Sequence, residues 1–432
     1  MAAPTLTDLF ATISTIIASA NLAKAQTEAL ISASLPVPQP VPVPVPVPTP
    51  VPVPVPVPVP PVKSGFYIGT QANFIASWSG EKIYKDNVNW ATTTDPWSPT
   101  WLADLSGYGC LRHMDTNSVN WSKITSWSQR KLPTDPKNAE VYIDGSSAAN
   151  TTGMAVEWQI DLCNKANVNC WLTHPYLADD DYIRQQALLA KALLKPGLKL
   201  YIELGNENWH GMFSSFQQAI DAGARLSLPG SNKWYSGIAH AMFRSLQMYA
   251  IYEEVFGKVS MGTSVIRVFA QSGNLDLTTQ ALANVYQSGK WNPTAQRIDL
   301  LALAPYIGNG WDGATVTFQQ WKDDVDQKVA GEPIGTAKKQ MTANGIPLLG
   351  CYEGGAHFLQ NADKFARNSL AEQCYDYMLD QWSKNMNDVF NHYTLHGTWS
   401  SGAAWGAFDH TGQPLSDAPK ARSLQKFIQT HK

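Results

Sequence analysis

The chain has 432 residues, of which 44% are hydrophobic, and a formal net charge of -3. This length suits one large domain or two smaller ones, and the nearly balanced charge excludes electrostatic attraction to nucleic acid or an anionic membrane as an organising feature. Sixteen Trp residues are an unusually large share. They either fill a core or offer flat apolar faces to ring-shaped ligands, and composition leaves both readings open.

Residues 1–35 are predicted to form a short helical segment for anchoring or oligomerisation. Their apolar residues recur at spacings of three and four, as on one face of a helix: Leu6, Leu9, Ile13, Ile16 and Ala20. A secretory signal peptide is the less favoured alternative, because the first Lys or Arg is Lys24, after the apolar stretch. The sequence therefore leaves three locations open: outside the cell, on the cell surface or on a virion. It has no typical signal peptide.

Residues 36–62 alternate Pro with Val almost throughout. Each Pro removes a backbone donor and fixes φ, so neither a helix nor a sheet ladder can form. We expect a polyproline II linker of roughly 80 Å, at about 3.1 Å per residue. A docking ligand is the alternative, but the lack of flanking charged and aromatic residues favours a spacer.

Residues 63–432 are predicted to be a (β/α)8 TIM barrel. Eight apolar, β-rich runs alternate with helical patterns. The runs cover residues 66–70, 109–114, 168–175, 199–207, 259–266, 299–306, 346–355 and 392–399. A doubly wound sheet is the rival fold, but "IGTQANF" stands where that fold requires a Gly-rich phosphate loop.

Two acids end predicted strands that lie on opposite sides of such a barrel. Glu207 ends the fourth run and Glu353 ends the seventh. Active groups of TIM barrels sit at the carboxyl ends of strands, so these two carboxyl groups can face one another across the barrel mouth. A pair of carboxyl groups about 5–5.5 Å apart is the arrangement of a retaining glycosidase.

The motifs "GNE" at the end of the fourth run and "YEGG" at the end of the seventh resemble clan A of the glycoside hydrolases. The stretch from "LADDDYIRQQ" to "GNENWHGMF", together with "YEGGAH", is similar to a bacterial group described only as carbohydrate- or cellulose-associated. The resemblance extends from about residue 66 to the end of the chain. It implies a retaining (β/α)8 enzyme.

The resemblance also implies roles for individual residues. Glu207 would be the general acid/base and Glu353 the nucleophile, while Asn206 would bind the sugar 2-OH. Tyr306 would orient Glu353, and Arg112 would keep it ionised. An ordinary salt bridge at the barrel mouth is the alternative for Arg112.

Further substrate contacts are expected from residues near the strand ends. His174, Trp209 and His357 are candidate sugar ligands, and Trp399 and Trp405 both qualify as the aromatic platform below the sugar. A structural hydrogen-bonding role is the alternative for His174. Glu203 shares the strand and the side-chain parity of Glu207, and we interpret it as a buried, paired structural acid.

No metal-binding signature is present, and we expect neither a metal nor another cofactor. The five Cys residues give no dense disulfide framework, although a bridge between Cys163 and Cys170 stays open. The expected partner is a polysaccharide or oligosaccharide, with no nucleic acid and no membrane span. The N-terminal segment would self-associate or attach to a larger assembly.

The sequence therefore favours a retaining glycoside hydrolase that cleaves a β-linked polysaccharide within its chain. Two alternatives belong to other classes: a non-catalytic carbohydrate-binding barrel, and a particle-attached adhesin or virion-associated depolymerase. The presence of both acids disfavours the purely binding protein.

Overall fold

A computed structural model describes residues 65–72, 80–138, 153–230, 232–271 and 274–431. The chain divides into two compact units, Met1–Pro58 and Val59–Lys432, and every described residue belongs to the second. The predicted helical segment (1–35) and Pro-Val linker (36–62) lie outside the described residues, so these assignments stay predictions.

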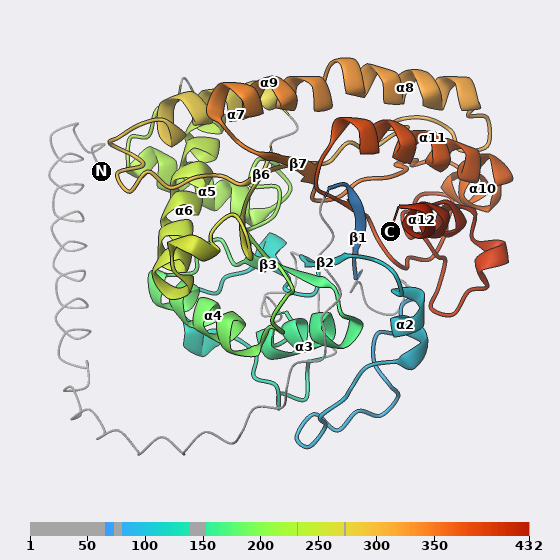
Figure 1. The fold of residues 1–432 in the computed structure, drawn as a ribbon, viewed down its shortest axis with the longest axis horizontal. Helices are drawn as coiled ribbons and strands as arrows, with labels where there is room; N and C mark the ends of the chain where they lie inside the picture. The colour runs from blue at the N-terminus through green and yellow to red at the C-terminus, as the bar shows by residue number, and fades with distance from the viewer. Residues whose placement is uncertain (1–64, 73–79, 139–152, 231, 272–273, 432) are drawn as a thin grey trace, which may run out of the picture. The chain divides into compact units, whose positions relative to one another are not determined.

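The described residues form eight parallel strands that close into a barrel in sequence order, which confirms the predicted (β/α)8 fold (Figure 1). Each strand pairs with its neighbours in the chain, and β1 also pairs with β8. The strands are β1 (Tyr67–Gln71), β2 (Cys110–His113), β3 (Asn169–His174), β4 (Leu200–Leu204), β5 (Val265–Ala270), β6 (Leu300–Leu303), β7 (Leu348–Cys351) and β8 (Val389–His392).

Helices connect the strands and surround the barrel (Figure 1). They are α2 (Pro99–Asp104), α3 (Val156–Ala166), α4 (Asp180–Leu193), α5 (Ser214–Arg225), α6 (Lys233–Phe256), α7 (Leu275–Ala281), α8 (Phe318–Ala330), α9 (Ile334–Asn344), α10 (Ala362–Arg367), α11 (Ser369–Asn385) and α12 (Pro419–Thr430). Short helical turns are η1 (Val119–Trp121), η2 (Trp127–Gln129), η3 (Lys258–Ser260), η4 (Leu282–Tyr286) and η5 (Leu415–Asp417).

Local sequence signals explain where several helices begin. The Asp179 side chain accepts a hydrogen bond from the Tyr182 backbone N–H and caps α4, with Asp180 and Asp181 in the first turn. These negative charges stabilise the positive end of the helix dipole. Asn232 caps α6 in the same way.

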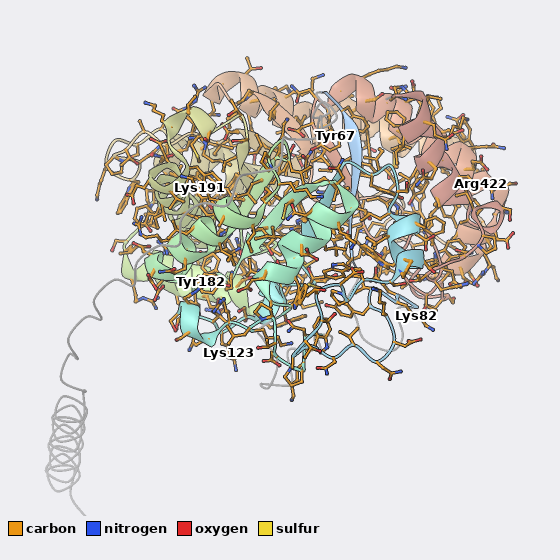
Figure 2. All side chains as sticks on the ribbon, turned by 60° about the horizontal axis from the view of Figure 1, so that its bottom comes forward. Tyr67, Lys82, Lys123, Tyr182, Lys191 and Arg422 are labelled. Atoms are coloured by element: carbon orange, nitrogen blue, oxygen red, sulfur yellow. The ribbon has the colours of Figure 1, made fainter. Side chains whose placement is uncertain are left out.

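Side chains pack the inside of the barrel and the layer between strands and helices (Figure 2). The interior cluster is Tyr67, Cys110, Trp171, Tyr201, Ile266, Val268, Leu300, Ala302, Tyr352 and Val389. Trp171 and Tyr201 stack there with ring centroids 5.3 Å apart. Because this cluster fills the lumen, substrate access is confined to the ends of the barrel.

Two strand positions predicted from sequence are wrong. The predicted strand 259–266 overlaps β5 only at Val265 and Ile266, because the residues before them form a turn with Gly262 at φ +78°. The predicted strand 392–399 follows β8, which ends at His392. Arg267 inside β5 breaks the apolar pattern, although its guanidinium is neutralised by Asp299 at 2.7 Å. The shift in β8 changes which aromatic residue leaves the strand into the barrel mouth.

In the ranges that the structure describes, no helix combines the length and apolarity needed to cross a bilayer.

Candidate active site

Glu207 leaves β4 in an unusual backbone conformation. Gly205 has φ +63°, and a Cβ at this position would lie 2.3 Å from the Asn208 Oδ1 atom, so only Gly fits. Glu207 itself has φ +42°, a strained value for a residue with a side chain. Such strain is concentrated at functional sites, which makes Glu207 a candidate for chemistry rather than an ordinary turn residue.

Glu353 stands just beyond β7 and is held by two donors from other strand ends. The Arg112 guanidinium contacts its Oε2 atom at 3.2 Å, and the Tyr306 hydroxyl donates to its Oε1 atom at 3.0 Å. Glu353 is buried, with a side chain only 8% exposed. Each carboxylate oxygen therefore has a fixed donor before any substrate arrives.

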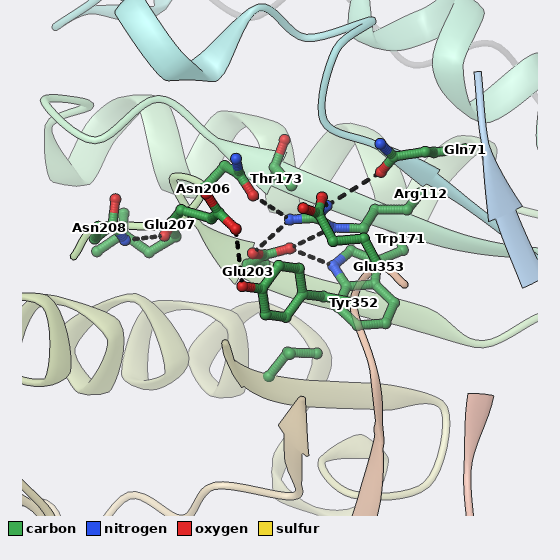
Figure 3. Close-up of polar contacts among 12 residues, drawn as sticks. Gln71, Arg112, Trp171, Thr173, Glu203, Asn206, Glu207, Asn208, Tyr352 and Glu353 are labelled. Carbon is green, nitrogen blue, oxygen red and sulfur yellow. Dashed lines mark hydrogen bonds and ion pairs between the residues drawn. The ribbon is translucent and has the colours of Figure 1, made fainter. Parts of the chain in front are cut away.

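Arg112 of β2 is the centre of the polar network (Figure 3). Its side chain is fully buried and forms a two-point ion pair with Glu203, at 2.8 and 2.9 Å. It also donates to Asn206 Oδ1 at 2.8 Å and to Gln71 Oε1 at 3.1 Å. The planar guanidinium of Arg112, on β2, thus connects residues of β1 and β4 with Glu353, just beyond β7.

Glu203 is the main partner of Arg112 and has a structural role, in line with the sequence interpretation. Besides the two Arg112 bonds, its Oε2 atom accepts the Trp171 indole N–H at 2.7 Å. A bidentate Arg partner and an indole donor satisfy this buried carboxylate. Arg112 therefore forms a buried ion pair with Glu203 and also contacts Glu353, while its role in keeping Glu353 ionised stays a prediction.

The electrostatics distinguish Glu207 from Glu353. Burial raises the pKa of Glu207 to about 8, and the Glu353 charge and a side-chain hydrogen bond with Glu353 add to the rise. Burial also raises the pKa of Glu353, but the Arg112 charge and the Tyr306 hydroxyl oppose that rise. The two carboxyl groups lie side by side, and Glu207 is the one that keeps its proton at neutral pH.

Asn206 is fixed by both ends of its amide. Its Oδ1 atom accepts from Arg112, and its Nδ2 atom donates to Asn120 Oδ1 at 2.9 Å. A side-chain amide nitrogen has two N–H donors, so one remains beyond the Asn120 bond. Asn206 is therefore rigid and able to donate to a ligand.

Aromatic rings continue the site beyond the two acids. His357 lies between Tyr306 and Trp405, with ring centroids at 5.2 and 5.8 Å. Tyr393, the first residue after β8, contacts Tyr306 at 6.3 Å and Trp405 at 5.9 Å. The predicted ligands His357 and Trp405 therefore adjoin the acids through Tyr306 and Tyr393.

Three other predicted sugar ligands, Trp399, His174 and Trp209, do not lie beside the acids Glu207 and Glu353. Trp399 is 4% exposed, and its indole N–H donates to the Gly406 carbonyl oxygen at 3.0 Å. His174 is fully buried, with its ring nitrogens 2.9 Å from the Glu203 carbonyl oxygen and 2.8 Å from the Tyr252 hydroxyl.

The His174 contacts correspond to its structural alternative, so we assign it no substrate contact. Trp209 packs against the hydrophobic core, and its Nε1 atom has no partner in the described part of the chain. Neither residue contributes to the site proposed below.

Sequence reasoning missed three residues of this site. The Tyr352 hydroxyl donates to Glu207 Oε1 at 3.1 Å (Figure 3). Tyr393 was overlooked because β8 was expected three residues later. Asp115, which is buried beyond the end of β2, follows no strand alternation, and only its position three residues after Arg112 could have pointed to it.

Within the described ranges, one group has the spacing of metal ligands: His113, Cys163 and Cys170, all buried in the core. The His113 Nε2 atom lies 3.3 Å from the Cys163 sulfur, which is also the geometry of a weak hydrogen bond. All five Cys residues are buried free thiols, so the bridge between Cys163 and Cys170 is not formed.

No family model matches the sequence, and no curated protein matches it either. Several solved structures resemble the fold. A GH5-4 broad-specificity endoglucanase from Clostridium longisporum is 10% identical with a TM-score of 0.46, covering 85% of this chain and 97% of its own. A Bacteroidetes-affiliated GH5 cellulase is 11% identical with a TM-score of 0.45, covering 85% and 91%.

A β-glucosidase from Thermotoga maritima is 12% identical with a TM-score of 0.43, covering 85% of this chain and 98% of its own. These likenesses are distant.

Proposed function

We propose that this protein is a retaining glycoside hydrolase that acts on a β-linked polysaccharide. The observation that carries the proposal is the meeting of two carboxyl groups with different protonation, Glu207 from β4 and Glu353 from β7. Glu207 is protonated at neutral pH, and Glu353 accepts bonds from Arg112 and Tyr306. A proton donor beside an anchored carboxylate is the pair that double displacement requires.

In the first step, Glu353 attacks the anomeric carbon while Glu207 gives its proton to the departing glycosidic oxygen. The new bond joins Glu353 to the sugar, and the old bond to the leaving group breaks. Tyr306 and Arg112 aim the Glu353 carboxylate and leave its Oε atoms little freedom to rotate.

In the second step, water replaces Glu353 at the anomeric carbon. Once Glu353 is esterified its negative charge is gone, so the charge that raises the pKa of Glu207 is removed. The pKa of Glu207 then falls, and the ionised Glu207 takes a proton from the attacking water. The same residue thus serves as acid and then as base.

Asn206 supports the transition state in this mechanism. Its remaining amide N–H is available to the sugar 2-OH, and the Arg112 and Asn120 bonds prevent the amide from turning away. A bond to the 2-OH strengthens as the oxocarbenium-like state develops, so it lowers the barrier.

The aromatic group of Tyr306, His357, Trp405 and Tyr393 supplies flat faces beside the acids. Trp405 is partly exposed whereas Trp399 is buried, which favours Trp405 as the sugar platform of the two. Sugar rings stack on such faces through their apolar C–H surfaces. An extended polysaccharide fits this arrangement.

A non-catalytic sugar-binding barrel is the alternative, and the strained Glu207 backbone disfavours it, because binding alone requires no strained acid. Attachment of the barrel to a larger particle through residues 1–62 is compatible with either function.

The test is hydrolysis of a panel of plant and bacterial polysaccharides by the wild type and by Glu207→Gln and Glu353→Gln. We expect sugar release by the wild type and a fall of roughly 1,000-fold or more in both variants. Glu254→Gln is the matched control, since Glu254 is 60% exposed on α6 and pairs with Arg184. Full activity of either site variant would refute the assignment, and tight binding without cleavage would favour the binding barrel.

A further inference from the structure

His113, Cys163 and Cys170 meet in the layer between the strands and the helices. His113 is the last residue of β2, Cys170 lies in β3, and Cys163 lies on α3. Their ligand atoms, one imidazole nitrogen and two sulfurs, all lie within 4.8 Å of one another. Three separate elements of the fold thus bring one nitrogen and two sulfur donors to a single place.

Strand alternation separates this cluster from the proposed catalytic site. Arg112 is paired in register with Trp171, and the Arg112 guanidinium lies 5.7 Å from the centre of the Trp171 ring, inside the barrel. Successive side chains of a strand point to opposite faces, so His113 and Cys170 point outward, toward the helices. Cys163 and Cys170 belong to the hydrophobic cluster of that layer. The wall of the barrel therefore lies between the cluster and the proposed catalytic acids.

The His113 ring is held in place by a contact on each nitrogen. Its Nδ1 atom lies 3.0 Å from the Thr116 hydroxyl oxygen, and its Nε2 atom lies 3.3 Å from the Cys163 sulfur. When Nδ1 carries the proton and donates it to Thr116, the lone pair of Nε2 points toward the sulfur. A hydrogen bond of this kind on the second ring nitrogen orients the histidines that bind metals.

A hydrogen-bonded core without a metal is the ordinary alternative. In that state an Nε2–H group points at the Cys163 sulfur, the ring also hydrogen-bonds the Gln159 backbone, and the two thiols act as small apolar side chains. Both states use the same side chains, so the metal content of the protein distinguishes them.

The donor set suits a soft metal ion. Thiolate and imidazole are ligands that Zn²⁺ and Cu⁺ prefer. With Zn–S and Zn–N bonds of about 2.3 and 2.0–2.1 Å, donors around one ion lie about 3.5–4 Å apart. The cluster, with donor atoms within 4.8 Å, reaches that spacing by shifts of less than about 1 Å.

The charge of the bound site also suits the interior. All three side chains are fully buried. Binding displaces one proton from each thiol to water, and bonds form from the metal to both sulfurs and to the imidazole nitrogen. The zinc complex is then uncharged and the copper complex carries a single negative charge. Burial costs least for an uncharged group, which favours zinc of the two.

We propose that His113, Cys163 and Cys170 bind one soft metal ion, Zn²⁺ or Cu⁺, which cross-links β2, β3 and α3. This site departs from the sequence-based expectation that the chain binds no metal. Its role is to stabilise the barrel wall, and it does not depend on the proposed glycosidase.

The first experiment measures the metal content of the wild-type full chain after growth with added zinc, or with copper under reducing conditions. We expect about one ion per chain, and X-ray absorption of the zinc sample should show two sulfurs at about 2.3 Å and one nitrogen at about 2.0–2.1 Å. Retention of either ion supports the site and identifies the metal. A chain without metal, or an ion bound by oxygen and nitrogen alone, would overturn the proposal. No variant is needed, so a folding defect cannot obscure the result.

The second experiment removes one sulfur at a time. Cys163→Ser and Cys170→Ser are each expected to lower the metal content at least about tenfold. Cys351→Ser is the matched control, because Cys351 is also fully buried but contacts the Met386 sulfur at 3.5 Å instead. It should keep the ion. Full metal content in both cluster variants, or an equal loss in Cys351→Ser, would contradict the assignment.

The third experiment measures stability and counts thiols. The metal-loaded wild type should melt roughly 3–8 °C above the chelator-treated protein, and Cys170→Ser should show no such difference. Alkylation of the denatured, metal-free wild type should modify all five thiols. Modification of two fewer thiols, with Cys163 and Cys170 joined by a disulfide, would overturn the metal site.

Discussion

At the amino-terminal end of the barrel, Asp388 is a buried acid beside tyrosines, and at the carboxyl-terminal end Glu207 and Glu353 are buried acids beside an arginine. Asp388 Oδ1 accepts the Tyr201 hydroxyl at 2.8 Å and the Val389 backbone N–H at 2.7 Å. Tyr201 in turn contacts Tyr67 at 2.7 Å, which receives a bond from Asn169. The donors to this acid are neutral hydroxyl and amide groups, and the Lys199 charge opposes the rise of its pKa that burial causes.

The carboxyl-terminal end differs, because two buried acids lie side by side there. Glu207 and Glu353 raise each other's energy when both are ionised, and Glu207 adopts a strained φ. A structure selected for stability alone would separate such acids or provide a cation for each. We infer that the amino-terminal end of the barrel stabilises the fold, whereas the carboxyl-terminal end holds the proposed catalytic acids at a cost in stability.

The largest effect is expected from removal of the proposed attacking carboxylate. Glu353→Ala is expected to lower hydrolysis of the best substrate by at least about 1,000-fold, because no group remains to form the glycosyl–enzyme bond. Added azide should restore part of the rate and give a glycosyl azide of inverted configuration, measured by NMR. A retained azide configuration would contradict the nucleophile assignment.

A second test replaces an arginine at each end. Arg112→Lys keeps the charge but loses the fork that orients Glu203, Asn206 and Glu353, so we expect a roughly 100-fold fall in kcat. Arg267→Lys disrupts the two-point pair with Asp299, at 2.7 and 2.8 Å. It should lower the melting temperature and leave kcat nearly unchanged. Equal kcat values for both variants would remove the distinction between the two ends.

Loss of one hydroxyl group at each end gives a finer test. Tyr352→Phe removes the donor to Glu207, and kcat/KM should fall roughly tenfold. The Tyr352 bond lowers the pKa of Glu207, so its loss raises that pKa and moves the alkaline limb of the pH–rate profile upward from about pH 8. Tyr201→Phe should leave the profile unchanged. A downward shift in Tyr352→Phe would oppose Glu207 as the acid.

The raised pKa of Glu207 should make the stability of the folded protein depend on pH. Folded Glu207 keeps its proton to about pH 8, whereas an ordinary Glu ionises near pH 4.5. The folded state therefore binds more protons between these values, and its stability falls as the pH rises through that window.

Because Gln cannot ionise in the unfolded chain, Glu207→Gln should raise the melting temperature by roughly 2–5 °C at pH 7, and the gain should vanish near pH 4. Scanning calorimetry at both pH values checks this, with Glu254→Gln showing no such pH dependence. A gain that is equal at both pH values would indicate packing rather than titration.

The smallest effect is expected from deletion of residues 1–62. If they are an anchor and a polyproline II spacer, the barrel should fold and retain the wild-type kcat, while self-association or attachment is lost. Light scattering and the hydrolysis assay measure the two properties separately. A chain that no longer folds would contradict the division into anchor, linker and barrel.

Much of the architecture was predictable because parallel strands buried on both faces are read as apolar runs between amphipathic helices. This pattern located six of the eight strands. It failed at β5 and β8, where Arg267 and the polar "NH" of β8 interrupt the apolar signal. Because of the error at β8, Tyr393, which adjoins Trp405, was not among the predicted site residues.

The barrel class and the positions of Glu207 and Glu353 near strand ends could be predicted from the sequence, because strand periodicity and the order of the elements are local properties of the chain. The folded barrel was needed to show that Arg112 donates to both Glu203 and Glu353 and that Tyr352 donates to Glu207. These relations depend on barrel closure, which brings together side chains more than 200 residues apart, such as Arg112 and Glu353. Their distances and burial set the protonation of each acid, and no local pattern encodes them.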